Sequence, residues 1–391
     1  MKKTFIYLLF SVTFWNIGCK PDGDFTYYYY TPEEQAILSP YLDLPEKPIS
    51  YAPVMPSYLS VSAGIFERQI PDYAKVELGR VLFYDKNLSK DGTISCASCH
   101  KQALAFADDA AVSKGVFERA GERNSIALAS VPSFSAAYDQ TGNSLFWDNR
   151  AQTVQEQSKA SLANVKEMDM SMTEVVNAVN SQPYYAVLMK KAYGGDGTAT
   201  EERVTEAIQT FVHSLSSFKS KFDEAAQDRF MASNQSFTFE LEDFGKFSAQ
   251  ENKGKSIYLS NCATCHTNVA TIPRMPFASN GLDEYPTDPG VGGVSSVASE
   301  MGTFKIPSLR NIGLTAPYMH DGRFQTLEAV VEHYSTGVKP HVNLDPNLKN
   351  SNGAPKNLHL SVSDKQALVA FLHTFTDNTL ASDQRFINPF K

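Results

Sequence analysis

The sequence carries the pentapeptide C-x-x-C-H twice, as CASCH at residues 96–100 and as CATCH at residues 262–266. This run is the attachment signature of c-type haem, because two thiols one helical turn apart can add to the vinyl groups of one porphyrin. The histidine that follows is then placed to bind the iron from one side. The repeat therefore predicts two covalently bound c-type haems, held by Cys96, Cys99 and His100 in the first copy and by Cys262, Cys265 and His266 in the second.

Two other interpretations of these motifs are open. A C-x-x-C pair can be a thioredoxin-type redox centre, and four cysteines with two histidines can bind zinc. No βαβ pattern surrounds either motif, and a thioredoxin-type centre has no need of the histidine. Paired zinc ligands usually lie close together in a sequence, whereas these two motifs stand far apart. Both observations favour haem.

A helix-like stretch precedes each motif. Residues 74–83 place apolar side chains at helical spacing before the first motif. Before the second, Ser248 and Glu251 form a capping-box pattern that starts a helix. Clusters of proline and glycine over residues 271–293 and 337–354 predict loops that line or bridge the two halves of the chain.

The sequence therefore predicts a mainly α fold, made of two cytochrome c-like haem domains with long loops and little strand. We expect the N-terminal domain, with the first haem, over residues 61–240 and the C-terminal domain, with the second haem, over residues 241–391. A helix over residues 363–375 is expected to close the second domain.

The composition limits the remaining functions. The chain has 391 residues, of which 42% are hydrophobic and 20% charged, so it can bury a core and is not globally disordered. Its net charge is −8, and an acidic chain is a poor binder of nucleic acid, because phosphate contacts need a basic surface. Five cysteines are too few for a disulfide scaffold. Outside the two motifs, one cysteine is left, Cys19.

The N-terminus has the features of an export signal. Two lysines precede an apolar run over residues 5–15, which has the length of a secretory signal and is too short for a permanent membrane helix. A small residue precedes Cys19, as in a lipobox. We expect residues 1–19 to be a lipoprotein-type signal peptide whose acylated cysteine tethers the protein to the cell envelope, in the periplasmic space. An ordinary signal peptide or a short anchor is the alternative. Residues 20–60 are rich in proline and predict an extended tether, with the tyrosine run at 27–30 packed on the protein body.

The histidines indicate how each iron is completed. A haem iron with two protein ligands transfers electrons, whereas one with an open face can activate a peroxide. After the first motif no histidine follows until His213, and the others outside the motifs lie at positions 320, 333, 341, 359 and 373. The first haem is therefore expected to keep an open distal face.

Three segments resemble one family. They are LSKDGTISCASCH at residues 88–100, IPSLRN at residues 306–311 and TAPYMHDG at residues 315–322. They resemble the bacterial dihaem cytochrome c peroxidases, a family that also includes the MauG-type enzymes, which use peroxide to oxidise residues of a partner protein. The resemblance runs from about residue 64 to residue 377.

The resemblance implies roles for several residues. Trp147 matches the tryptophan that lies between the two haems and is the candidate electron relay. Gln157 and Glu167 match the distal glutamine and glutamate of the family. A carboxylate over an open iron can take a proton from one peroxide oxygen and return it to the other, and an amide can hold the peroxide. This chain departs from the family at residues 160–161, where Ala-Ser replaces a frequent Gly-Pro step.

The second haem departs further from the ordinary peroxidases. Their far ligand is a methionine, but the matching position here is Tyr334, as in MauG-type enzymes. An oxygen ligand stabilises ferric iron relative to a thioether and lowers the reduction potential. The rival ligands are His333 and three methionines, Met275, Met301 and Met319.

The resemblance also implies a calcium ion between the haems, with Asn124, Thr315 and Pro317 as the matching positions. Asn124 would offer a side-chain oxygen and the other two would offer backbone carbonyls, which are the hard donors that calcium prefers. Homodimers are common in the family, and nothing in this sequence demonstrates one.

Three functional hypotheses follow. The leading one is a dihaem peroxidase that reduces hydrogen peroxide to water with electrons from a small cytochrome or cupredoxin. The second is a MauG-like enzyme that oxidises residues of a partner protein, which Tyr334 favours. A MauG-type quinone-forming role is disfavoured by the tryptophans. The only two are Trp15 and Trp147, so no tryptophan stands just before Cys262, where it could serve a docked partner. The third is a plain dihaem electron carrier, which would have two six-coordinate irons.

Overall fold

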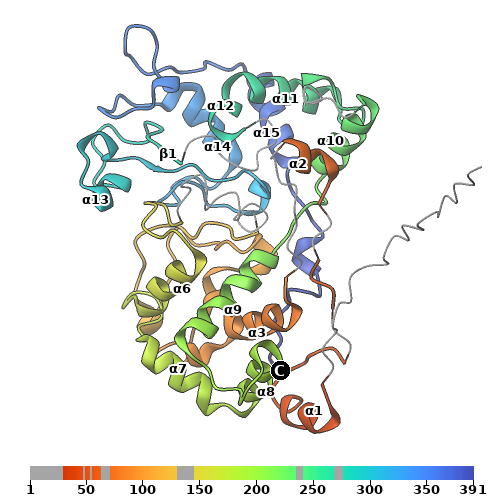
Figure 1. Cartoon of the computed structure of the whole chain (residues 1–391). Helices are drawn as coiled ribbons and strands as arrows, with labels where there is room; N and C mark the ends of the chain where they lie inside the picture. Colours follow the sequence, from red (N-terminus) through yellow and green to blue (C-terminus); the bar gives the residue numbers. More distant parts are fainter. Residues whose placement is uncertain are drawn as a thin grey trace, which may run out of the picture.

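The computed structural model describes residues 30–46, 49–52, 55–62, 71–129, 145–234, 241–267 and 276–391. These residues form two mainly helical lobes, one above the other in Figure 1, each with its own hydrophobic core. In the described part of the chain the only paired strands are β1 (Phe277–Ala278) and β2 (Phe304–Lys305), which run antiparallel. The predicted mainly α fold with little strand is confirmed.

The first lobe contains helices α1, α3, α4 and α6 to α9. Their bounds are α1 Pro32–Leu38, α3 Tyr73–Tyr84, α4 Cys96–Cys99, α6 Val154–Ala163, α7 Met172–Ser181, α8 Pro183–Tyr193 and α9 Glu201–Ser214, with short 3₁₀ turns η1 Lys86–Leu88, η2 Gln102–Leu104, η3 Val116–Glu118 and η10 Leu380–Ser382.

The second lobe contains α2 and α10 to α15. Their bounds are α2 Ser57–Ser62, α10 Lys221–Ala232, α11 Ala249–Asn261, α12 Ala263–His266, α13 Val291–Ser295, α14 Leu327–Glu332 and α15 Val362–His373, with 3₁₀ turns η6 Ala298–Glu300, η7 Ile312–Leu314 and η9 Pro346–Leu348 and a π-helical turn η8 His333–Gly337.

The helix before each C-x-x-C-H motif packs across a later helix, and the two backbones approach each other most closely at a glycine of the first helix. A Cβ at Gly79 of α3 would lie 1.9 Å from the carbonyl oxygen of Ala207 in α9. A Cβ at Gly254 of α11 would lie 1.9 Å from the carbonyl oxygen of Ala367 in α15. Both lobes therefore use the same close helix crossing to support the motif that follows, in agreement with two related halves.

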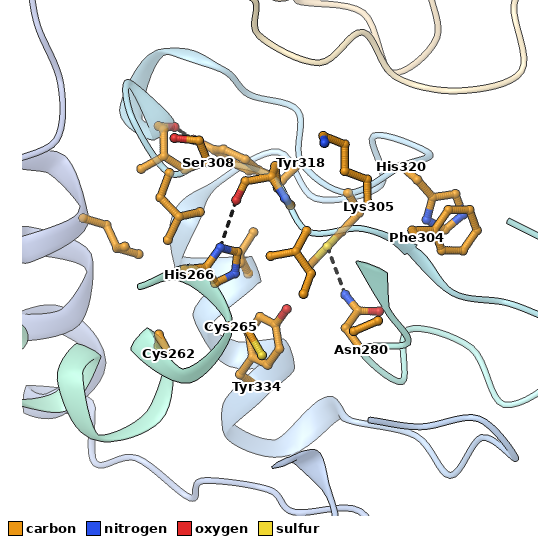
Figure 2. Close-up of a pocket in the computed structure, with 18 of the residues that line it drawn as sticks. Cys262, Cys265, His266, Asn280, Phe304, Lys305, Ser308, Tyr318, His320 and Tyr334 are labelled. Carbon is orange, nitrogen blue, oxygen red and sulfur yellow. Dashed lines mark hydrogen bonds between the residues drawn. The ribbon is translucent and has the colours of Figure 1, made fainter. Parts of the chain in front are cut away.

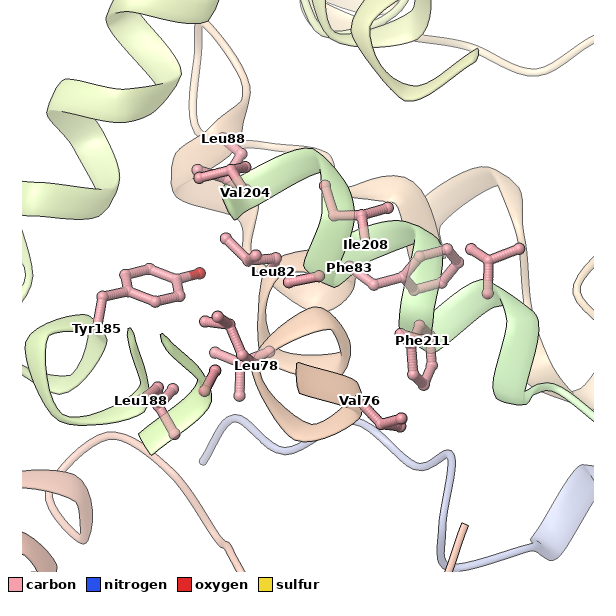
Figure 3. Packing of buried hydrophobic residues seen from close by; sticks show 14 of the residues in the cluster. Val76, Leu78, Leu82, Phe83, Leu88, Tyr185, Leu188, Val204, Ile208 and Phe211 are labelled. Carbon is pink, nitrogen blue, oxygen red and sulfur yellow. The ribbon is translucent and has the colours of Figure 1, made fainter. Parts of the chain in front are cut away.

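Aromatic and aliphatic side chains seal these crossings. In the first lobe Phe83 packs against Phe211 with ring centroids 5.1 Å apart, and Leu78 and Ile208 belong to the same buried cluster (Figure 3). In the second lobe the capping box of Ser248 and Glu251 starts α11, as the sequence predicts. The C-terminal end of α11 then leads directly into the second motif.

The division between the lobes differs from the predicted boundary at residue 240, because segments on either side of that boundary are buried in the other lobe. Helix α10 precedes that boundary, yet its Phe222 and Phe230 belong to the second core. Leu380 and Phe386 near the C-terminus belong to the first core. Figure 1 accordingly shows the C-terminus beside α1 and α8. Hydrophobic burial, and not sequence order, assigns these segments to their lobes.

The region predicted as a tether over residues 20–60 is packed where the structure describes it. Leu38, Leu42 and Tyr51 are buried in the first core, and Tyr58 and Leu59 in the second. Its buried aromatic and leucine side chains explain why this segment contacts both lobes instead of extending away from them. Residues 1–29, with Cys19 and the proposed signal, lie outside the described residues. Among the helices of the described residues, none combines the length and apolar character that crossing a membrane requires.

Replacing Gly254 with alanine should destabilise the second lobe. Alanine gains about 1 kcal/mol of helix propensity, but its Cβ collides with the Ala367 backbone, and overpacking of this kind typically costs about 1–3 kcal/mol or more. Thermal unfolding of the haem-loaded protein measures the effect. Gly245→Ala is the control, because a Cβ at Gly245 meets no atom within 4 Å. Equal melting temperatures for both variants would contradict the close crossing.

Candidate functional site

The first motif lines a cavity of about 370 Å³ in the first lobe. Cys96, Cys99 and His100 form one part of its wall, and α4 carries both cysteines in a single helical turn. Of the residues that line this cavity in the described structure, His100 is the only histidine. His213, on the last turn of α9, is not in its wall.

The second motif lines another cavity, of about 240 Å³, in the second lobe (Figure 2). Cys262, Cys265 and His266 lie on one side of it, on and beside α12. The Tyr334 side chain enters from the π-helical turn η8, and its hydroxyl points into the cavity. Insertions of a π turn are frequent at functional sites, because they displace a side chain from the regular helical spacing.

Both motif histidines are prepared to bind a metal through one ring nitrogen. Nδ1 of His100 lies 2.8 Å from the carbonyl oxygen of Phe106, and Nδ1 of His266 lies 3.0 Å from that of Pro307. A neutral imidazole that donates from Nδ1 leaves the lone pair of Nε2 for iron. Burial favours the neutral form, since it lowers the pKa of His100 and lowers that of His266 to about 4. The residues present therefore fit a c-type haem in each cavity.

The motif cysteines do not have the surroundings of a redox pair. Burial raises the pKa of Cys96 and Cys262 to about 12 and that of Cys99 and Cys265 to about 11. A thioredoxin-type pair needs a lowered thiol pKa. Nor do the described residues bring three or more His, Cys, Asp or Glu side chains together as a zinc site would require. The geometry favours thioether attachment.

The predicted distal residues line the first cavity together with its motif. Gln157 lies on α6, and Glu167 follows in the turn after that helix. Nδ2 of Asn164 donates to Oε1 of Glu167 over 2.8 Å. Burial raises the pKa of Glu167, although hydrogen bonds from Ser161 and Asn164 act in the opposite direction. A buried carboxyl group with a raised pKa is suited to exchange protons near neutral pH.

Ser161 is a further residue of this wall. It lies four residues after Gln157 on α6, so both side chains share one helix face. Nε2 of Gln157 donates to Oγ of Ser161 over 3.1 Å, and the Ser161 hydroxyl acts to lower the pKa of Glu167 against the effect of burial. The departure from the Gly-Pro step thus supplies a hydroxyl between the two predicted distal groups. Its spacing from Gln157 was a signal that could have identified it in the sequence.

A glycine fixes the backbone of Glu167. The carbonyl oxygen of Glu167 accepts from the backbone N–H of Val116 over 2.8 Å. A Cβ at the preceding Gly115 would lie 2.5 Å from that same oxygen. The turn that carries the carboxylate is therefore pressed against the 115–116 segment, which limits its movement.

Trp147 lies in the wall that separates the two cavities. It lines both of them, as do Asn124 and Lys305. Nε1 of Trp147 donates to the carbonyl oxygen of Asn124 over 2.8 Å, and the backbone N–H of Lys305 donates to the carbonyl oxygen of Trp147 over 2.8 Å. Burial lowers the pKa of Lys305 to about 8. The indole is thus held in place between the two motifs.

The structure distinguishes the candidate ligands of the second haem by their position relative to the second cavity. Met319 lines the cavity beside Tyr334, whereas Met301 is 38% exposed and is not in its wall. Met275 lies outside the described residues. His333 is buried, with Nε2 directed at the carbonyl oxygen of Asn280 over 3.0 Å. Burial raises the pKa of Tyr334 to about 12.

The three positions matched to calcium come together at the second cavity. Asn124, Thr315 and Pro317 all line it, although Asn124 is distant in sequence from the other two. The backbone N–H of Asn124 donates to the carbonyl oxygen of His320 over 2.7 Å, which ties the first lobe to the TAPYMHDG segment.

Comparison with known proteins agrees with this arrangement. The family model described as di-haem cytochrome c peroxidase matches residues 73–230. The chain is 31% identical over 306 residues to the methylamine utilization protein MauG of Methylorubrum extorquens, covering 77% of each chain. It is 36% identical over 259 residues to the cytochrome c551 peroxidase of Nitrosomonas europaea, covering 66% of this chain and 71% of that protein.

Solved structures share the fold. A MauG-like protein associated with microbial copper homeostasis superposes with a TM-score of 0.66 at 30% identity, covering 81% of this chain and 93% of that one. The diheme peroxidase BthA from Burkholderia thailandensis has a TM-score of 0.60 at 22% identity, covering 80% and 88%. Two C-x-x-C-H motifs, two cavities and these relatives lead to one assignment. The chain belongs to the di-haem cytochrome c peroxidase and MauG family of oxidoreductases, whose members hold two c-type haems.

Proposed function

We propose that this protein is a dihaem peroxidase that reduces hydrogen peroxide to water in the first cavity. The observation that carries the proposal is that Glu167 and Gln157 line the same cavity as the first motif, while Trp147 lines both cavities. A c-type haem with an open face supplies peroxide activation, and one with two protein ligands supplies electron transfer.

Glu167 is the proposed proton carrier in the first cavity. As a carboxylate it takes a proton from one oxygen of the bound peroxide, and as a carboxylic acid it returns that proton to the departing oxygen. Asn164 holds the carboxylate, Ser161 holds the Gln157 amide, and Gln157 is in place to hydrogen-bond the peroxide.

Met168 also lines the first cavity. It is buried in the first core, where its role is packing.

The second cavity is the proposed entry for electrons. His266 and Tyr334 are the proposed iron ligands there, and Trp147 is the proposed relay to the first cavity. The donor would be a small cytochrome or cupredoxin that docks on the second lobe. Asn124, Thr315 and Pro317 are proposed to hold a calcium ion, through one side-chain oxygen and two backbone carbonyls.

A MauG-like activity, in which peroxide oxidises residues of a partner protein, is the second candidate. The position of Tyr334 in the wall of the second cavity favours it, because an oxygen ligand stabilises oxidised iron. For either activity, we propose export to the periplasmic space, attachment to the membrane through an acylated Cys19, and assembly as a homodimer.

One equivalent of hydrogen peroxide, added to the fully ferric protein with and without a reduced small c-type cytochrome, tests the proposal. Rapid oxidation of two equivalents of the cytochrome, the number of electrons that one peroxide accepts on reduction to water, is the expected result. A long-lived change in the haem spectrum with poor oxidation of the cytochrome would support the MauG-like activity instead. An unchanged spectrum would support a plain electron carrier.

Replacing Ser161 with alanine should slow the peroxide reaction without abolishing it. The variant removes the hydroxyl that accepts from Gln157, and a neutral hydrogen bond of this kind is worth about 0.5–1.5 kcal/mol, so a loss of roughly twofold to tenfold is expected. Stopped-flow absorbance of the haems measures the rate. Ser161→Thr keeps the hydroxyl and should retain most of the rate. If the alanine and threonine variants reacted equally fast, the hydroxyl would have no part in the reaction.

A further inference from the structure

Asn280 contacts the two residues that lie at the second cavity and rival Tyr334 as an iron ligand, Met319 and His333. Its Nδ2 donates to Sδ of Met319 over 3.4 Å. Tyr334 lines the same cavity as Asn280, and its hydroxyl points into that cavity. Its backbone carbonyl oxygen lies 3.0 Å from Nε2 of His333. One residue thus engages the sulfur and the nitrogen donor, while the Tyr334 oxygen stays directed into the cavity.

The backbone around Asn280 is held firmly. It follows β1, which pairs with β2, and its neighbour Ser279 forms a bridge with Leu344. On its other side, Gly281 has a φ of +66°, and its carbonyl oxygen accepts from the backbone N–H of Lys339 over 2.8 Å. The amide is therefore presented to the cavity from a fixed position, as Figure 2 shows.

The amide treats the oxygen and sulfur donors differently. A thioether sulfur is a weak hydrogen-bond acceptor, and the bond from Nδ2 engages one of its two lone pairs and holds the sulfur toward the amide. The Tyr334 hydroxyl, by contrast, points into the cavity, so its oxygen remains directed at the space beside His266. The carbonyl oxygen meanwhile engages the ring nitrogen of His333 and directs it away from the cavity.

We propose that Asn280 is a positioning residue that selects the Tyr334 oxygen, and not the Met319 sulfur, as the far ligand of the second haem. This inference rests on the proposed function, in which the second cavity holds an electron-transfer haem with His266 and Tyr334. The choice of ligand sets the reduction potential, because a thioether raises it relative to an oxygen donor.

Asn280→Leu in the haem-loaded protein tests the proposal. Removing the amide frees the Met319 sulfur, so we expect the ferric protein to acquire the near-infrared charge-transfer band of thioether-ligated haem. The midpoint potential of the second haem should shift upward. Asn280→Asp, which keeps the size but cannot donate, should shift both readouts in the same direction. The Asp variant keeps the test available if the leucine variant does not fold.

Two controls identify the source of the signal. Asn347→Leu makes the same substitution at another asparagine of the cavity wall and should leave band and potential unchanged. Met319→Leu in the Asn280→Leu background should remove the new band. A second-haem spectrum and potential unchanged by both Asn280 variants would overturn the proposal, as would a new band that survives Met319→Leu.

The proposed function is tested separately in the same preparations. Tyr334→Phe must alter the second-haem spectrum if the tyrosine is a ligand, and an unaltered spectrum would refute that ligand whatever Asn280 does. The peroxide reaction depends on the first cavity and is measured by cytochrome oxidation. A failure of peroxide turnover with a normal Asn280 response would therefore reject the peroxidase and retain the ligand selection.

Discussion

Replacing Glu167 with glutamine should slow the reaction with hydrogen peroxide by a factor of roughly 10²–10⁴, the usual contribution of a positioned general acid–base group. Glutamine keeps the shape of the side chain and can accept the hydrogen bond from Asn164, but it cannot take up and return a proton. The haem spectra and midpoint potentials should stay unchanged. Stopped-flow absorbance with peroxide in excess measures the rate.

The pH dependence of this reaction supplies a second readout. Burial raises the pKa of Glu167, and its protonated form cannot act as the base. The rate in the unaltered protein should therefore fall as the pH falls through that raised pKa, and the fall should be absent in Glu167→Gln. Glu202→Gln, on the exposed first turn of α9, is the matched control and should react at the normal rate. A normal rate in Glu167→Gln would remove this residue from the mechanism.

The parts of the site that could be predicted from the sequence are those whose residues lie close together in the chain. Each C-x-x-C-H motif is a single helical turn whose residues act on one porphyrin, so its chemistry does not depend on distant contacts. Gln157 and Glu167 lie on one helix and the turn that follows it, and the structure places both in the first cavity. The helix start at Ser248 is likewise decided by a local capping box.

The parts that sequence could not predict depend on contacts between distant segments. Asn280 follows a two-residue strand inside a loop-rich region, and only the folded chain brings it to Met319 and Tyr334. The crossing of α2 and of the C-terminal segment between lobes is decided by where Tyr58 and Phe386 are buried, and no local pattern records that choice. The shared wall at Trp147 likewise needs both lobes in place.

A buried ion pair holds the second lobe around its cavity, and Asp223→Asn should destabilise that lobe by about 3–5 kcal/mol. Arg310, in the cavity wall, and Asp223 of α10 are only 2% and 1% exposed. Nη2 of Arg310 lies 2.5 Å from Oδ1 of Asp223, and Tyr58 donates to the same oxygen over 2.6 Å. Asparagine keeps the shape but leaves the guanidinium charge buried without its counter-charge, which is the costly part of the change.

The sign of the pH effect distinguishes this pair from simple packing. Burial alone would raise the pKa of Asp223, but the Arg310 charge and the hydrogen bonds outweigh it and the pKa is lowered. The contribution of Asp223 is therefore complete above the pKa of an unfolded aspartate, about 3.9, and is lost as the pH falls through the lowered folded value. Asp223→Asn should lose this acid-dependent part of the unfolding free energy.

Urea unfolding of the haem-loaded protein, followed by the absorbance of the second haem, measures the loss. Asp228→Asn on the same helix is the control, because Asp228 is 64% exposed and its ion pair with Lys246 should contribute less than about 1 kcal/mol. The double variant Asp223→Leu/Arg310→Met should recover much of the stability, since it removes both charges together. If Asp223→Asn were no less stable than Asp228→Asn, the pair would not hold the lobe. If the double variant recovers stability, the loss in Asp223→Asn comes from the unpaired Arg310 charge, which lies next to the cavity that the second motif lines.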